Sequence, residues 1–206
     1  MKIIFGLGFL SCIVFTSFSQ MSADTEKLLK DQRSGNSSSD TLWKTGGLVN
    51  VNFSQVYLSN WAGGGQNAIS TQGILSLFAN YNKEKTSWDN SIDLAYGVIK
   101  QGEAKSTPWF KNDDRLELNS KFGHKVSEKW YYSGLFNFRS QFNYGYSKVG
   151  DTVPISNFMA PAYTIVALGM DYKPSKSFTF FVAPLTTKLT FVMDDYLSGI
   201  GAFGVD

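Results

Sequence analysis

The stretch Trp88-Asp89-Asn90-Ser91-Ile92-Asp93-Leu94-Ala95-Tyr96-Gly97-Val98 decides the fold class of this chain. Starting from Trp88, every second residue is mostly large and apolar, whereas the residues in between are small or acidic. Successive side chains of a β-strand point to opposite faces of a sheet, so this segment has one apolar face and one polar face. A strand with lipid on one side and a wet interior on the other has this pattern.

The same alternation recurs along the chain. Seven segments show it: residues 48–58, 67–82, 87–101, 113–123, 130–146, 160–173 and 178–192. Most of them reach the roughly 9–11 residues that a tilted strand needs to cross a bilayer. We therefore predict an all-β fold, an antiparallel up-and-down transmembrane β-barrel. Pro184 lies inside the last segment and lacks the backbone N–H of a ladder donor, which predicts a bulge or an early end there.

The connections between these segments alternate in length. In chain order they are long, short, long, short, long and short: residues 59–66, 83–86, 102–112, 124–129, 147–159 and 174–177. Bacterial outer-membrane barrels have short periplasmic turns and longer external loops. The regular alternation of long and short connections therefore favours a barrel over a soluble sandwich.

Aromatic residues gather near both kinds of connection. Trp and Tyr favour the headgroup zone of a bilayer, where one end of the side chain is apolar and the other is wet. We expect an interfacial girdle beside the short connections, formed by Tyr81, Trp88, Trp130 and Tyr172, with Phe178 close by. A second girdle is expected beside the long connections, formed by Tyr57, Trp61, Trp109, Tyr144 and Tyr146. The alternative is that these are core aromatics of a soluble β-sandwich.

The first 41 residues differ from the rest of the chain. Residues 1–19 have a positive start and a short apolar run, which is typical of a signal peptide cleaved after Ser19. Cys12 leaves a lipoprotein anchor as an alternative, but apolar residues follow it. Residues 20–41 are polar and Ser-rich, and we expect a disordered arm. Residues 42–206 form the expected barrel domain. Because Cys12 is the only cysteine, the mature chain has no disulfide and no thiol nucleophile.

The end of the chain gives a further expectation. Residues 193–206 resemble another long loop followed by the first residues of an eighth strand. Single-chain bacterial barrels have even strand numbers, and an open sheet edge in lipid leaves unpaired backbone groups. We therefore expect a truncated barrel of about seven strands plus the start of an eighth, with its C-terminal part missing.

Several stretches resemble a known family. They are Leu58-Ser59-Asn60-Trp61-Ala62-Gly63-Gly64-Gly65, Trp88-Asp89-Asn90, Leu94-Ala95-Tyr96-Gly97, Lys111-Asn112-Asp113-Asp114-Arg115-Leu116-Glu117-Leu118 and Ala160-Pro161-Ala162-Tyr163. In these the chain resembles the domain of unknown function 3078 family, uncharacterised outer-membrane proteins of Bacteroidetes-type bacteria. The resemblance implies an outer-membrane barrel in a longer protein. It assigns no activity and no catalytic residue.

Groups that could carry chemistry are few. His124 is the only histidine and is expected in a solvated turn, so it makes neither a catalytic base nor a metal site. The cluster Asn112-Asp113-Asp114 could bind calcium, but a salt-bridge network at the rim is the simpler interpretation. The loop from Asn60 to Gly65 lacks the helix or lysine of a phosphate cradle, so we expect a flexible hairpin. In that loop Trp61 is a candidate contact with the rim or a partner.

In each predicted strand the alternate residues that are polar are candidates for the barrel interior. It holds Asp89, Asp93, Arg115, Glu117, Lys121, Arg139 and Gln141. A regular hairpin around residue 106 would place Asp93 diagonal to Lys121 and near Asn119. Because both signs face inward, paired charges are expected rather than a one-sign ring. They would form either a polar plug or a narrow pathway for a solute.

These observations predict an integral outer-membrane β-barrel protein of a Gram-negative bacterium with a non-enzymatic role: a scaffold, an accessory of an envelope complex or a porin-like protein. No catalytic residue, cofactor or metal site is assigned. The expected partners are outer-membrane lipid and possibly another envelope protein. Nucleic acid is excluded because the net charge is only +2 and both signs are interspersed. The alternatives are a secreted soluble β-sandwich binding module and an outer-membrane barrel enzyme, which needs a Ser/His/Asp group at the outer rim.

Overall fold

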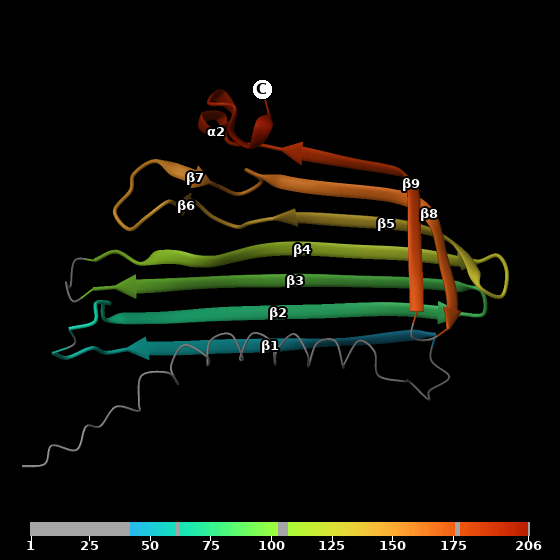
Figure 1. Ribbon diagram of the computed structural model, residues 1–206, viewed down its shortest axis with the longest axis horizontal. Helices are drawn as coiled ribbons and strands as arrows, with labels where there is room; N and C mark the ends of the chain where they lie inside the picture. The colour runs from blue at the N-terminus through green and yellow to red at the C-terminus, as the bar shows by residue number, and fades with distance from the viewer. Residues whose placement is uncertain (1–41, 61, 103–106, 176–177, 206) are drawn as a thin grey trace, which may run out of the picture. The chain divides into compact units, whose positions relative to one another are not determined.

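The computed structural model describes residues 42–60, 62–102, 107–175 and 178–205, which form mainly one antiparallel sheet (Figure 1). Its seven strands follow the order β1-β2-β3-β4-β5-β8-β9, and β6 and β7 make a separate two-stranded sheet. The strands are β1 (Trp43–Val56), β2 (Ala68–Lys83), β3 (Thr86–Gln101), β4 (Phe110–Lys125), β5 (Trp130–Ser140), β6 (Gly145–Tyr146), β7 (Pro154–Ser156), β8 (Ala162–Ser175) and β9 (Phe178–Phe191). The predicted all-β antiparallel fold is confirmed.

The main sheet has two end strands, β1 and β9, which do not pair with each other in the described part of the chain. Closure into a barrel therefore stays a prediction. The predicted signal peptide at residues 1–19, the arm at residues 20–41 and Trp61 lie outside the described residues.

The strands are joined by connections of alternating length. Residues 57–67, 102–109 and 141–161 form the long connections, and residues 84–85, 126–129 and 176–177 form the short ones. In the tightest described turn, Lys83 pairs with Thr86, and Glu84 adopts a φ of 46°. The predicted phase of long and short connections is confirmed, so all short connections join the strands at one edge of the antiparallel sheet.

The strand predicted over residues 130–146 is too long, because β5 ends at Ser140. Just beyond that end, the carboxylate of Asp114 accepts hydrogen bonds from the backbone N–H groups of Phe142 (2.7 Å) and Asn143 (3.0 Å). Gln141 Nε2 donates to the carbonyl oxygens of Asn157 (2.9 Å) and Ala160 (3.0 Å). These bonds hold the chain through a side chain of β4 and through a rim loop instead of through the backbone ladder of the sheet.

The bulge predicted at Pro184 is confirmed. Leu168 pairs with Leu185 and Met170 with Val182, so one residue of β8 lies opposite two residues of β9. The single residue is Gly169, where an added Cβ would lie 2.0 Å from the carbonyl oxygen of Val182. Both strands change direction part way along their length (Figure 1). A glycine is needed here because the backbone of β9 occupies the space of a side chain.

The predicted start of an eighth strand is wrong for the described part of residues 193–206. This segment forms a short helix, α2 (Asp195–Gly199), and a single 3-10 turn, η1 (Ala202–Gly204). The Asp194 side chain caps α2 by accepting a 3.0 Å hydrogen bond from the backbone N–H of Leu197. Local capping thus competes successfully with the extended conformation. No helix among the described residues has the length and apolar character needed to cross a membrane.

Candidate functional site

The large apolar side chains of the sheet lie on its solvent-accessible side. In β1, Val51 is 75% exposed and Phe53 is 64% exposed, whereas Asn50 and Asn52 are half-buried. We call the side that carries Val51 and Phe53 the apolar face and the opposite side the polar face. The buried polar or charged side chains of the described chain are Ser76, Ser133 and Asp171, and its buried apolar residues are Phe78, Leu197 and four alanines. Exposure of many large apolar side chains together with burial of a carboxylate is unusual for a water-soluble protein.

Strand pairing extends the polar face across the sheet. Ser76 on β2 pairs with Asp93 on β3, Asp93 pairs with Glu117 on β4, and Glu117 pairs with Arg139 on β5. Six of the seven candidate interior residues lie on this face: Asp89, Asp93, Arg115, Glu117, Lys121 and Arg139. The seventh, Gln141, lies beyond the end of β5 and binds the rim loop.

The expected position of Asp93 is wrong by two residues. Asp93 lies opposite Glu117, and Lys121 lies opposite Asp89. At the loop end of this hairpin Val98 pairs with Lys111, and an irregularity then shifts the register by one residue, so that Gly97 pairs with Asp113. The intervening Asn112 has no partner in the register, so the hairpin is not the regular one that the sequence prediction assumed.

Asp171 on β8 is the centre of the most buried polar cluster. Its side chain is only 1% exposed and accepts hydrogen bonds from Ser133 Oγ and Lys121 Nζ, each at 2.9 Å. Lys173 Nζ lies 3.8 Å from the same carboxylate. Sequence reasoning missed Asp171 and Ser133. The sequence did contain a signal. Asp171 is the only acidic residue of its segment, and two of the three alternate residues before it, Ala167 and Gly169, are small, as expected for the polar face.

A second polar cluster surrounds Glu117. Arg139 Nε lies 3.6 Å from its carboxylate, and Asn137 Nδ2 donates to Glu117 Oε1 at 3.1 Å. Asn137 also donates to Asn119 Oδ1 at 2.6 Å. Asp93 accepts hydrogen bonds from the hydroxyl groups of Ser76 and Ser91. The charged groups of these two clusters and Asp93 are therefore paired or hydrogen-bonded, and both signs are present.

The reach of Lys121 shows that the sheet curves toward the polar face. Its Nζ lies 4.6 Å from the centre of the Phe181 ring on β9, although β5 and β8 separate their strands. In a flat sheet, three strand spacings would hold these strands roughly 14 Å apart. Only a concave polar face brings one lysine side chain within reach of Asp171 and Phe181 together.

The other candidate groups have protein partners. His124 lies in β4 rather than in a turn, because β4 continues to Lys125, and its Nδ1 is 3.3 Å from Thr86 Oγ1. Asp113 accepts a hydrogen bond from Gln72, and Asp114 forms a 2.7 Å ion pair with Lys111. No group of three or more His, Cys, Asp or Glu residues in the described ranges has a metal-binding arrangement.

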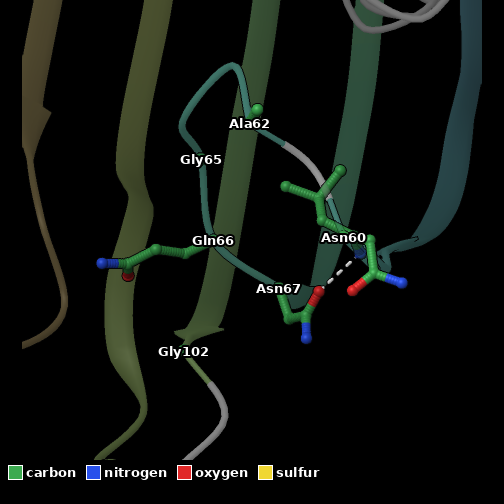
Figure 2. Close-up of a pocket in the computed structure, with 7 residues that line it drawn as sticks. Asn60, Ala62, Gly65, Gln66, Asn67 and Gly102 are labelled. Atoms are coloured by element: carbon green, nitrogen blue, oxygen red, sulfur yellow. Dashed lines mark hydrogen bonds between the residues drawn. The ribbon is translucent and has the colours of Figure 1, made fainter.

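The first long connection contains a pocket of about 750 Å³ (Figure 2). Its rim is held by a 2.6 Å hydrogen bond from the Leu58 backbone N–H to Asn67 Oδ1. Figure 2 shows Asn60 and Asn67 on one side of the loop and Gln66 extending to the other. The pocket is lined by Leu58, Asn60, Ala62, Gly65, Gln66, Asn67 and Gly102. It has amide groups but no charged group, so it offers no acid, base or nucleophile.

Aromatic side chains form a row on the apolar face beside the short connections. The Trp43 ring lies 5.1 Å from that of Tyr81 and 6.1 Å from that of Trp88. Farther along the same edge, on β5 and β8, the rings of Trp130 and Tyr172 are 4.7 Å apart. The four aromatic residues expected in the girdle beside the short connections, Tyr81, Trp88, Trp130 and Tyr172, are thus part of this row. Trp43 was not anticipated, because it precedes the first segment with clear alternation.

Comparison with known proteins gives one match. Residues 53–146 match the model of a family described as a protein of unknown function (DUF3078), which confirms the resemblance seen in the sequence. The matched region runs from β1 to β6 and includes both clusters' residues on β3, β4 and β5. No curated protein and no solved structure gives a significant match.

Proposed function

We propose that this chain forms the wall of an integral β-barrel in the outer membrane of a Gram-negative bacterium, with a non-enzymatic role as a scaffold, an accessory of an envelope complex or a porin-like protein. The observation that carries the proposal is the exposure of the apolar face beside a concave, charged polar face. Hydrocarbon is a favourable solvent for Val51, Phe53 and Leu185, which are 64–75% exposed.

The backbone supports this solvent assignment. In a bilayer every N–H and C=O group needs a protein partner, and antiparallel strands joined by hairpins meet this need between neighbours. Six of the seven strands have 14 to 16 residues, which exceeds the span of a tilted transmembrane strand. The strands are therefore long enough to cross the membrane and to extend beyond it.

The row of aromatic residues supports one orientation of the proposed barrel. Short turns lie on the periplasmic side of outer-membrane barrels, and aromatic girdles mark the two interfaces. In the proposed orientation, the rings of Trp43, Trp88 and Trp130 lie at the periplasmic headgroup level. The long connections, including the pocket of Figure 2, then face the cell exterior.

The polar face supports a scaffold or a narrow pathway better than an enzyme. The carboxylates of Asp171, Glu117 and Asp93 are engaged by lysine, arginine, asparagine or serine side chains, and the sole histidine lies on the apolar face near the short turns. A barrel enzyme needs an assembled acid, base or nucleophile that substrate can reach. Paired charges of both signs suit a hydrated interior.

A matched pair of arginine substitutions tests the proposal. Phe136 and Asn137 are neighbours on β5 that point to the apolar and polar faces. Phe136→Arg should block assembly into outer membranes, since an arginine on the lipid face costs about 2–4 kcal/mol at the bilayer midplane. Asn137→Arg should assemble, because its side chain enters a wet interior beside Glu117. Equal assembly of the two variants would contradict the assigned faces.

Fractionation separates the proposal from a secreted binding module. An integral barrel stays in the membrane pellet after carbonate washing and changes its electrophoretic mobility when heated. A soluble β-sandwich would appear in the periplasm or the culture supernatant. Recovery of most of the protein in either soluble fraction would overturn the proposal.

A further inference from the structure

We propose that a groove on the apolar face binds the acyl chain of an anionic phospholipid, whose phosphate lies beside the lysines of the short connections. This inference rests on the proposed membrane location and goes beyond it by assigning a lipid site. The groove has a volume of about 710 Å³ and lies where β4, β5, β8 and β9 run together.

Two glycines create the groove. Gly134 on β5 lies between Phe122 on β4 and Leu168 on β8, so the apolar face lacks one side chain in the middle of this row. Gly169 allows β9 to bulge at Pro184 beside it. The walls are formed by Phe122, Trp130, Tyr132, Leu168, Met170 and Leu185. Aromatic and aliphatic walls around a missing side chain fit a flexible hydrocarbon chain.

The groove opens toward the row of aromatic residues. Trp130 is both one of its walls and a partner of Tyr172 in the 4.7 Å ring contact. If this row lies at the headgroup level, a lipid whose chain occupies the groove has its phosphate at the same level as the short connections.

The charge at that end of the sheet is complementary to an anionic headgroup. The short connections and adjoining strand ends carry Lys83, Lys85, Lys125 and Lys129, against Glu84 and Glu128, whereas Lys173 at the same end is directed toward Asp171 on the polar face. A backbone hydrogen bond from Lys125 N to the carbonyl oxygen of Lys85 brings two of these lysines together across the turns. Clustered lysines at a membrane surface attract anionic lipid.

The opposite end has a different charge. The long connections and adjoining segments carry Asp113, Asp114, Asp151, Asp194 and Asp195, against Lys100, Lys111, Arg115 and Lys148 among the described residues. A second apolar hollow, beside Gly73, lies among Val51, Leu94, Tyr96 and Phe142. It has the apolar character of the first groove without the aromatic row and the lysines of the short turns. It therefore serves as an internal comparison.

The test uses the full chain extracted in detergent, with native mass spectrometry after addition of phosphatidylglycerol or phosphatidylcholine. Wild type should retain one phosphatidylglycerol, and phosphatidylcholine should bind more weakly. Gly134→Leu fills the groove and should weaken phosphatidylglycerol binding by about tenfold, because the acyl chain loses its apolar contacts. An added Cβ at Gly134 lies 3.3 Å from Leu168 Cδ2, the end of a flexible side chain that can move slightly to make room for it.

Two control variants make the result specific. Gly73→Leu places the same side chain on the same face, with no atom within 4 Å of the new Cβ, and should bind like wild type. The double variant Lys125→Gln and Lys129→Gln should lose the preference for phosphatidylglycerol over phosphatidylcholine. Equal binding by Gly134→Leu and wild type would overturn the proposal. So would a dimer mass that Gly134→Leu abolishes, since a second copy would then occupy the groove.

Membrane assembly is measured separately for each variant by carbonate washing and heat-dependent mobility. Wild type and all variants should assemble if the outer-membrane proposal is correct. Failure of lipid retention in an assembled protein rejects only the lipid site, whereas failure of wild type to assemble rejects the proposed function as well.

Discussion

Lys121 on β4 and Asp171 on β8 form a 2.8 Å ion pair across an intervening strand. The carboxylate is almost fully buried, and Ser133 on that intervening strand donates to it as well. One acidic residue thus connects three neighbouring strands through their side chains. The pair also depends on the curvature of the sheet, because a flat sheet would separate the two groups by two strand spacings.

Replacement of Asp171 by alanine should destabilise the sheet by up to about 3 kcal/mol, because it leaves Lys121 and the Ser133 hydroxyl without their buried acceptor. Urea unfolding of the membrane-inserted protein, followed by its heat-dependent mobility, measures the change. Glu117→Gln is the matched control on the same face. The Glu117–Arg139 contact is longer, at 3.6 Å, and the Arg139 side chain is 59% exposed, so we expect a loss below about 1 kcal/mol. Similar losses in both variants would argue against a special role of the Asp171 cluster.

Gly169→Ala should be severely destabilising. The new Cβ would lie 2.0 Å from the carbonyl oxygen of Val182 and 2.6 Å from Ala183 Cα, and both are backbone atoms that cannot rotate away. We expect the free energy of unfolding to fall by about 3 kcal/mol or more, which is at the upper end of the range for overpacked sites. Gly73→Ala is the control, since its Cβ meets nothing within 4 Å and reduces the freedom of the unfolded chain. The same unfolding assay should find it neutral or slightly stabilising. A tolerated Gly169→Ala would mean that β8 and β9 can move apart at the bulge.

The bulges separate what the sequence predicts from what it does not. Pro184 predicts one of them, because proline has no N–H group to donate a hydrogen bond to a central ladder. The structure has a bulge at that residue. Asn112 gives no such signal for the irregularity beside it, and Asp93 lies opposite Glu117, two residues from the expected position. Alternation identifies the face of a residue because parity survives a shift of two residues. It does not identify the cross-strand partner, which depends on loop length and bulges.

The same argument explains the missed cluster. Asp93, Glu117 and Lys121 lie in segments with clear alternation, so their common face can be predicted. Asp171 binds Lys121 across β5 only because the sheet is curved, and curvature is a property of several strands together. The end of β5 was also unpredictable, since Asp114, a residue of β4, withdraws the Phe142 and Asn143 N–H groups from the ladder.

The aromatic row should be energetically coupled. The rings of Trp43 and Tyr81 lie 5.1 Å apart with an interplanar angle of 54°. A double-mutant cycle with Trp43→Leu and Tyr81→Leu should give a coupling free energy of about 0.5–1.5 kcal/mol. The control cycle pairs Trp43→Leu with Tyr172→Leu, because Tyr172 contacts Trp130 instead. For two sites that do not touch, the effects of the single substitutions on the free energy of unfolding should add to within about 0.3–0.5 kcal/mol. Equal coupling in both cycles would point to a change in membrane embedding rather than to ring contact.

The cap of α2 should titrate in acid. Asp194 accepts hydrogen bonds from the Leu197 backbone N–H and from Asn157 Nδ2, and chiefly the first holds the pKa of Asp194 below its ordinary value of 3.8. A lowered pKa in the folded state means that the capping contribution is complete above about pH 4 and is lost as the pH falls through the folded pKa. The amide resonance of Leu197 should therefore shift with a midpoint below 3.8 in an NMR pH titration. Asp194→Asn should keep the helix cap, because asparagine is an equally good N-cap, and should remove that titration. Asp195→Asn is the control and should retain it. A Leu197 shift that persists in Asp194→Asn would assign the acid transition to another carboxyl group.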